Sequence, residues 1–213
     1  MKTYIVTILL AFLSFPAIAQ QQQAKAVLDK TAETFRKAGG VQIMFDVKSY
    51  TNGQLEGTSG GEIRLKGEKF VLKTPEASTW FDGKTQWSYM ESSEEVNVTN
   101  PTPEELRSIN PYTLLYMYQQ GFTYQLGAAT QYAGKKVKEV ILTSTDSRQD
   151  LSRIVLKVAQ DTYQPVFIQL QQRGTKNYSE IVVTGYRTGQ NYTDKEFVFD
   201  RSKYPDAEII DLR

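Results

Sequence analysis

Residues 82–89 read Asp-Gly-Lys-Thr-Gln-Trp-Ser-Tyr, and this stretch says most about the fold. An Asp-Gly pair favours a tight hairpin turn, and the residues after it alternate as they do in a β-strand, so Trp87 and Tyr89 share one face. The strand before the turn adds Trp80 beside them. Such an aromatic face either packs in a core or lines a binding surface, and the sequence leaves both readings open.

The start of the chain has the regions of an export signal. Residues 4–15 are apolar, and residues 17–19 read Ala-Ile-Ala, the small-x-small pattern that signal peptidase cuts. We expect cleavage after Ala19, which divides the chain into a signal peptide (1–19) and one domain (20–213). The apolar stretch is shorter than the about 20 residues of a membrane-spanning helix, although a retained anchor helix is the alternative. The mature protein is therefore predicted to be exported, soluble and periplasmic.

Composition excludes much chemistry. The chain has no Cys and no His, which removes disulfides, thiolate nucleophiles, His-based metal sites and the usual general base near neutral pH. Lack of disulfides in an exported domain favours a bacterial periplasm. Loss of Lys2 with the signal peptide leaves 24 basic and 24 acidic residues. A surface without net charge gives no steering toward nucleic acid, and we expect neither a cofactor nor a metal.

One catalytic motif needs an explanation. Residues 57–61 read Gly-Thr-Ser-Gly-Gly, which matches the nucleophile elbow of α/β-hydrolases. An elbow must open a helix and needs a His partner, but residues 62–66 alternate like a strand and the chain has no His. We therefore expect a glycine-rich hairpin turn or bulge here. The acidic pairs at 94–95 and 104–105 are read as a solvated turn and a first helical turn, so no catalytic residue is predicted.

The mature chain predicts a mainly β domain with one amphipathic helix. Residues 21–37 have helical apolar spacing and end at Gly39-Gly40. From there the period is two, and we expect an antiparallel meander of about eleven strands that curls into a barrel or open half-barrel. The expected strand segments are 41–47, 63–65, 70–72, the 80–89 hairpin, 96–98, 122–126, 137–143, 154–158, 166–170, 181–183, 197–199 and 209–212.

Two short helices are expected to interrupt the strands. Pro101 to Leu106 begins the first, with Thr102 as N-cap candidate, and residues 112–120 form the second. The second helix is apolar or aromatic nearly all round, so it must be covered on two sides or face a space that apolar molecules fill. It is therefore either a core plug or a lid.

Several of these segments together resemble the LolA family of periplasmic outer-membrane lipoprotein carriers, over most of the mature chain. That resemblance implies an open antiparallel half-barrel covered by the N-terminal helix and short lid helices around an apolar cavity. One departure is that many members have an Arg-Pro after the second strand, whose arginine holds the lid shut, whereas Lys66-Gly67-Glu68 stands here. The resembling segments are 61–65, Phe70, 82–89, 95–96, 110–115 and 197–199.

The resemblance implies a non-enzymatic chaperone for acylated lipoproteins. An inner-membrane lipoprotein-releasing ABC transporter would load it, and it would unload to an outer-membrane acceptor or to the membrane directly. Two other functions stay open. A lipid- or glycolipid-binding sensor on the same fold would bind a partner protein stably, and a secreted hydrolase would use Asp, Glu or Tyr.

We expect the acyl chains to lie in an apolar cavity under a lid. Which strand face is concave cannot be read from the sequence, because a slip of one residue exchanges the two faces. The expected lid residues are Leu106, Ile109, Leu114, Leu115 and Met117. The expected cavity residues are Phe45, Ile63, Leu65, Phe70, Leu72, Trp80, Trp87, Tyr89, Val96, Ile154, Leu156, Ile168 and Ile181.

The lid hypothesis is testable by one substitution. Leu114→Glu is expected to abolish loading of a doubly labelled lipoprotein while the barrel stays folded, because a carboxylate cannot cover acyl chains without a large desolvation cost. Unchanged loading of the variant would show that this helix is not the lid.

Overall fold

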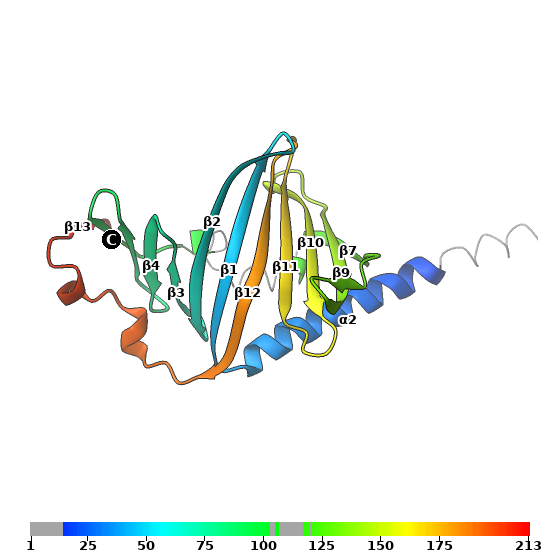
Figure 1. Cartoon of the computed structure of the whole chain (residues 1–213), viewed down its shortest axis with the longest axis horizontal. Helices are drawn as coiled ribbons and strands as arrows, with labels where there is room; N and C mark the ends of the chain where they lie inside the picture. The colour runs from blue at the N-terminus through cyan, green and yellow to red at the C-terminus, as the bar shows by residue number, and fades with distance from the viewer. Residues whose placement is uncertain (1–14, 103–104, 107–116, 120) are drawn as a thin grey trace, which may run out of the picture.

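A computed structural model describes residues 15–102, 105–106, 117–119 and 121–213 (Figure 1). One long helix, α2 (Phe15–Lys37), lies against one large sheet, and three short 3₁₀ turns follow at η1 (Met117–Gln119), η2 (Asp194–Phe197) and η3 (Arg201–Lys203). The strands are β1 (Gly40–Thr51), β2 (Gln54–Lys66), β3 (Lys69–Lys73), β4 (Ala77–Phe81), β5 (Gln86–Met90), β6 (Glu95–Thr99), β7 (Phe122–Leu126), β8 (Gln131–Tyr132), β9 (Lys135–Ser144), β10 (Leu151–Ala159), β11 (Pro165–Gln172), β12 (Tyr178–Gln190) and β13 (Glu208–Asp211).

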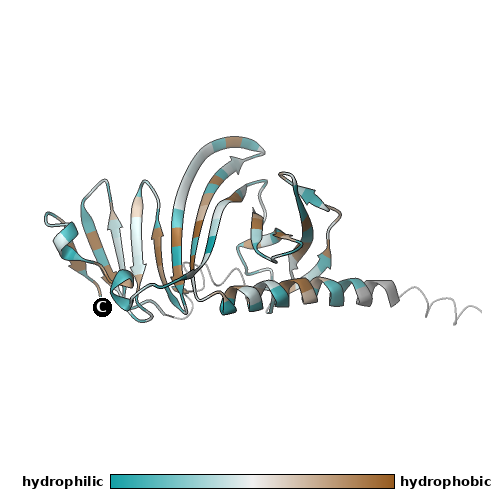
Figure 2. Ribbon diagram, turned by 60° about the horizontal axis from the view of Figure 1, so that its bottom comes forward, coloured by the Kyte–Doolittle hydropathy of each residue, from teal (hydrophilic) through white to brown (hydrophobic). Residues whose placement is uncertain are grey.

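The strands form a single open sheet. Its order is β13-β6-β5-β4-β3-β2-β1-β12-β11-β10-β9-β7, with β8 attached to β9. All neighbours are antiparallel except β13, which is parallel to β6. Within the described residues β13 and β7 do not pair with each other, so the sheet ends at two edges instead of closing. Figure 2 shows the sheet arching over α2. This arrangement confirms the predicted open half-barrel, with thirteen strands where about eleven were expected.

The hairpin at residues 82–89 forms as predicted. The Asp82 carboxylate accepts hydrogen bonds from the backbone N–H groups of Lys84 and Thr85, both at 2.8 Å. Gly83 has φ +101°, a conformation that favours glycine. These contacts fix the turn, and β4 and β5 then pair with Trp80 opposite Trp87.

The Gly-Thr-Ser-Gly-Gly motif lies inside strand β2. Its residues pair with β1 from Ser49–Gly57 to Phe45–Gly61, and the strand continues to Lys66 instead of opening a helix. The prediction of a turn at these residues is therefore wrong, although a bulge lies beside Gly57, between Ser49 and Tyr50 of β1. Gly61 is needed because a Cβ there would lie 2.8 Å from the Phe45 ring and 2.5 Å from the Lys73 carbonyl oxygen.

Helix α2 contacts the sheet with one face only. Ala24, Val27, Leu28, Ala32 and Phe35 are all buried, and their spacing of three and four residues places them on one side of the helix. Buried Thr31 donates its hydroxyl hydrogen bond to the Val27 carbonyl oxygen at 2.9 Å. We call the face of the sheet that α2 covers the helix-side face.

Residues 191–207 cover the opposite face beside the β4–β5 hairpin. Their side chains Phe197, Phe199 and Tyr204 pack on Trp80 and Tyr89, with ring centroids 4.6 Å apart for Tyr89 and Tyr204. We call residues 191–207 the C-terminal cover. Residues 197–199 were predicted as a strand, and this prediction is wrong. The chain instead forms η2, because the Glu196 carboxylate accepts a 2.8 Å hydrogen bond from the Thr193 N–H.

Removal of the Phe197 ring is expected to destabilise the fold. Phe197 is completely buried, so Phe197→Ala should lower the free energy of unfolding by about 3–5 kcal/mol in urea titrations. The matched control is Val198→Ala next to it, because Val198 is 37% exposed. Equal, small effects of both substitutions would mean that the C-terminal cover does not pack on the sheet in solution.

Candidate functional site

The helix-side face carries two apolar clusters. We call the first the β1–β4 cluster, whose buried members are Phe35, Val41, Ile63, Leu65, Phe70 and Phe81. We call the second the β7–β11 cluster. In it Ala24, Val27 and Leu28 of α2 pack with Tyr118 of η1 and with the strand residues Phe122, Val140, Leu142, Ile154, Leu156 and Val158. Both clusters are core, since their members are fully enclosed.

A less enclosed apolar surface connects the two clusters. In the middle of the sheet Val47 pairs with Ile181, Ile181 with Ile168, and Ile168 with Leu156, so one row of apolar side chains crosses four strands on one face. Phe45 and Val183 form the next row. Phe45, Val47, Ile168, Ile181 and Val183 are only half-buried. We call these five residues the central strip, and its register positions hold no charged side chain.

Beyond the β1–β4 cluster the same face becomes polar, and four neighbouring positions of it hold uncharged groups. Leu72 pairs with Thr79, Thr79 with Ser88, and Ser88 with Asn97, so hydroxyl and amide groups continue the row. The Gln86 amide donates to the Ser88 hydroxyl at 3.1 Å, while its own oxygen is buried and has no hydrogen-bond partner among the described residues. We call Thr79, Gln86, Ser88 and Asn97 the neutral polar strip.

Tyr186 adds a second uncharged polar group. It pairs with Ile43 of β1 and packs against the β1–β4 cluster. Burial raises the pKa of its phenol above the ordinary value, so the side chain is neutral at physiological pH. The helix-side face therefore offers apolar surface and neutral hydrogen-bonding groups, which suits an uncharged amphiphilic ligand.

Most of the predicted cavity residues lie together on the helix-side face. The strand register and the clusters place there Phe45, Ile63, Leu65, Phe70, Leu72, Ile154, Leu156, Ile168 and Ile181.

Four predicted cavity residues lie on the other side of the sheet. Trp80, Trp87, Tyr89 and Val96 occupy the opposite face, where the C-terminal cover packs on them. Cross-strand partners share a face of the sheet. Trp80 pairs with Val71 of β3, whereas Phe70, the residue before Val71, pairs with Phe81, so Trp80 and Phe70 lie on opposite faces. A sheet therefore separates these four residues from the central strip, and we leave them out of the candidate site.

The predicted lid is described only in part. Leu106 packs at the edge of the β1–β4 cluster. Ile109, Leu114 and Leu115 lie outside the described residues, as does the side chain of Met117 at the start of η1. In the same 3₁₀ turn, buried Tyr118 donates a 2.8 Å hydrogen bond to Asp29 of α2, which ties η1 to the helix.

Sequence reasoning missed several residues of this face. Phe81, Val41 and Tyr186 belong to the β1–β4 cluster but were not proposed for the site. Phe81 could have been found from the pairing of β3 with β4, because that register places it opposite Phe70. Phe35 lacked any strand signal, since it comes from the helix.

Lys66, at the position where the family resemblance led us to look for an arginine, contacts the C-terminal cover. Its amine donates to the Tyr192 carbonyl oxygen at 2.7 Å and lies 3.4 Å from the Asp194 carboxylate. Lys69 lies 2.9 Å from the same carboxylate. Hydrogen bonds from Lys69 and Lys66 hold the pKa of Asp194 below its ordinary value. In this structure Lys66 therefore fastens residues on the face opposite α2.

The described part of the chain shows neither a cluster of metal ligands nor a membrane-spanning helix. It contains no group of three or more acidic, His or Cys side chains that could hold a metal ion. It also contains no helix long and apolar enough to cross a membrane.

An open half-barrel with an apolar strip and neighbouring uncharged polar groups on its helix-side face is of the carrier or binding type. The family model described as outer membrane lipoprotein carrier protein LolA matches residues 14–175, and the chain belongs to this family. No curated protein gives a significant sequence match.

Three solved structures are similar to this chain at low sequence identity. An uncharacterised conserved protein from Thermus thermophilus matches with a TM-score of 0.61 and 11% identity, over 89% of this chain and 99% of that one. A LolA superfamily protein from Nitrosomonas europaea matches with a TM-score of 0.43 and 13% identity, over 83% and 98%. The Pseudomonas aeruginosa MucA/MucB complex matches with a TM-score of 0.44 and 16% identity, over 84% and 61%.

Proposed function

We propose that this protein is a periplasmic, non-enzymatic chaperone that binds the acyl chains of lipoproteins and carries them from the inner to the outer membrane. The observation that carries the proposal is the central strip, a half-buried apolar surface without charge between two closed clusters. Isolated surface leucines or valines need no explanation, but a continuous apolar face across four strands does.

The energetics of the cargo require such a surface. Each exposed CH₂ costs about 0.8 kcal/mol, so one sixteen-carbon chain costs roughly 12 kcal/mol in water. A lipoprotein therefore cannot cross the aqueous periplasm without a carrier. The carrier must also release its cargo, so its affinity has to lie between those of the donor and the acceptor.

The two kinds of surface suggest how a lipoprotein would lie. We place the acyl chains along the central strip and the glyceryl and peptide part toward the neutral polar strip. The second placement would give the unpaired Gln86 oxygen a donor, since a buried acceptor without a partner is costly. Removal of a signal peptide at 1–19 would leave α2 to begin near Gln20, so Ala24, Val27 and Leu28 would remain in the mature chain.

The partners that we propose follow from the direction of transport. An inner-membrane lipoprotein-releasing ABC transporter would supply the cargo, and an outer-membrane acceptor or the outer membrane itself would receive it. Because Lys66 contacts the C-terminal cover, we propose that opening of the helix-side face does not depend on this residue.

A second candidate function is a lipid- or glycolipid-binding sensor on the same fold. The neutral polar strip favours it, because hydroxyl and amide groups without charge suit the hydroxyls of a sugar. The two functions differ in cargo and in exchange, since a sensor would not pass its ligand between membranes.

Native mass spectrometry tests both candidates. Mature protein purified from its native periplasm without detergent should release an acylated peptide or lipoprotein in stoichiometric amount. Release of a free glycolipid or phospholipid would instead support the sensor, and a protein that carries no added mass would contradict both functions.

One substitution connects the cargo to the central strip. Ile181→Glu should lower the fraction of loaded protein by about tenfold or more, because a carboxylate would have to be desolvated against an acyl chain. Thr188→Glu is the matched control, since Thr188 lies on the same strand and is exposed. Equal loading of the two folded variants would place the ligand elsewhere.

A further inference from the structure

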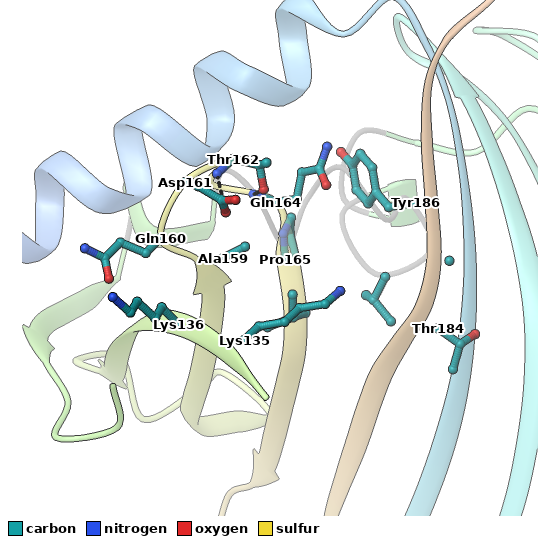
Figure 3. Close-up of a pocket in the computed structure, with 13 residues that line it drawn as sticks. Lys135, Lys136, Ala159, Gln160, Asp161, Thr162, Gln164, Pro165, Thr184 and Tyr186 are labelled. Atoms are coloured by element: carbon teal, nitrogen blue, oxygen red, sulfur yellow. Dashed lines mark hydrogen bonds between the residues drawn. The ribbon is translucent and has the colours of Figure 1, made fainter. Parts of the chain in front are cut away.

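Strands β11 and β12 separate along part of their length and leave a cleft. Their pairing runs from Gln171–Tyr178 to Phe167–Val182 and stops there, although β12 continues to Gln190. The space beyond has a volume of about 730 Å³. Figure 3 shows it between Thr184 and Tyr186 of β12 on one side and the turn at Gln160 to Gln164 on the other.

Two local features keep the strands apart. Pro165 begins β11 and has no N–H, so it cannot donate to a neighbouring strand. In β12, Phe45 pairs with Val183 but Met44 pairs with Gly185, so Thr184 is an extra residue in a bulge. A bulge bends its strand and increases the local twist, which turns β12 away from β11.

The result is a free strand edge inside the sheet. Residues 183–187 pair with β1 through Phe45, Met44, Ile43 and Gln42. In the part of the chain that the structure describes, their other side has no partner strand. Five residues of an edge present a row of donors and acceptors about 16 Å long, which an added strand can satisfy.

The opposite wall is held open by its own hydrogen bonds. The Tyr163 N–H donates to the Ala159 carbonyl, and the Ala159 N–H donates to the Gln164 carbonyl, both at 2.9 Å. The Tyr163 hydroxyl accepts from Lys138 at 2.7 Å. Because these backbone groups already have hydrogen-bond partners within the turn, the turn gains no hydrogen bonds from them by moving onto β12.

The cleft has an excess of positive charge at its rim. Lys135 and Lys136 are exposed and form no ion pair with any described residue, and Figure 3 shows both beside the cleft. The single acidic residue of the lining, Asp161, accepts a 2.8 Å hydrogen bond from the Thr162 N–H. The lining therefore carries two positive charges and one negative charge.

We infer that this cleft binds an extended acidic segment of a partner protein, which adds a strand to the β12 edge at residues 183–187. Main-chain hydrogen bonds would supply the pairing, as in other cases of strand addition, and Lys135 and Lys136 would select acidic side chains. The inference does not rest on the proposed function, because its main-chain pairing and its two lysines lie outside the central strip, although the side chains of Val183 and Tyr186 line both surfaces.

Hydrogen–deuterium exchange with a synthetic peptide tests this site. The probe is a peptide of alternating valine and glutamate, about seven residues long to cover the edge, and the comparison is the same peptide with lysine in place of glutamate. The glutamate peptide should slow exchange of the amides at 183–187, and the lysine peptide should not. No protection there, or equal protection by both peptides, would overturn the inference.

Charge reversal provides the matched test. The double variant Lys135→Glu/Lys136→Glu should bind the glutamate peptide about tenfold more weakly, the sum of two exposed charge contacts, and should gain affinity for the lysine peptide. Lys176→Glu is the control, because this exposed lysine lies in the turn at the other end of β11.

Two further outcomes separate this inference from its alternatives. Protection at 183–187 that grows with protein concentration in the absence of peptide would mean that a second copy of the chain fills the cleft, and would overturn the partner assignment. Loss of lipid loading in an otherwise folded double variant would contradict the independence of the two sites, whereas unchanged loading supports it.

Discussion

The pairing of β1 with β12 is the constraint on which the rest of the structure depends. β1 is the first strand in the sequence and β12 is the last long one. They pair with each other over most of their length, and this pairing joins two half-sheets into one. This ladder places Phe45, Val183 and Ile181 in the middle of the helix-side face. The same ladder contains the bulge at Thr184, so the apolar surface and the free edge are both consequences of one long-range pairing.

Helix α2 and the C-terminal cover pack on opposite faces of the sheet. α2 packs on the helix-side face through residues spaced as one helical stripe, and the cover packs on the opposite face through aromatic rings. Because the sheet is a single layer, one face of every strand lies on the helix side and the other lies on the side of the C-terminal cover. The β4–β5 hairpin is buried on the opposite face, while on the helix-side face polar Thr79, Gln86 and Ser88 adjoin Phe81, so the β1–β4 cluster extends only to Phe81 of β4.

Local sequence patterns predicted the secondary-structure elements well. They did not predict which side chains share a face of the sheet, because that depends on the strand register. The Asp82 turn and the helix ending near Gly39 follow from residues next to one another, so the sequence contains the whole signal. The choice between Trp80 and Phe81 as a lining residue depends on which of them faces Phe70, and that register is set by the neighbouring strand. Residues 197–199 alternate like a strand, but the hydrogen bond from Thr193 to Glu196 starts a 3₁₀ turn there.

The position of both tryptophans has a spectroscopic consequence. Trp80 and Trp87 pack under the C-terminal cover, and a complete β-sheet lies between them and the helix-side face. Their emission therefore reports on solvent access beneath Phe199 and Tyr204, which lie against Trp80. Tryptophan emission therefore reports on the face opposite to the one proposed for an acyl ligand, and a ligand on the helix-side face should leave this emission unchanged.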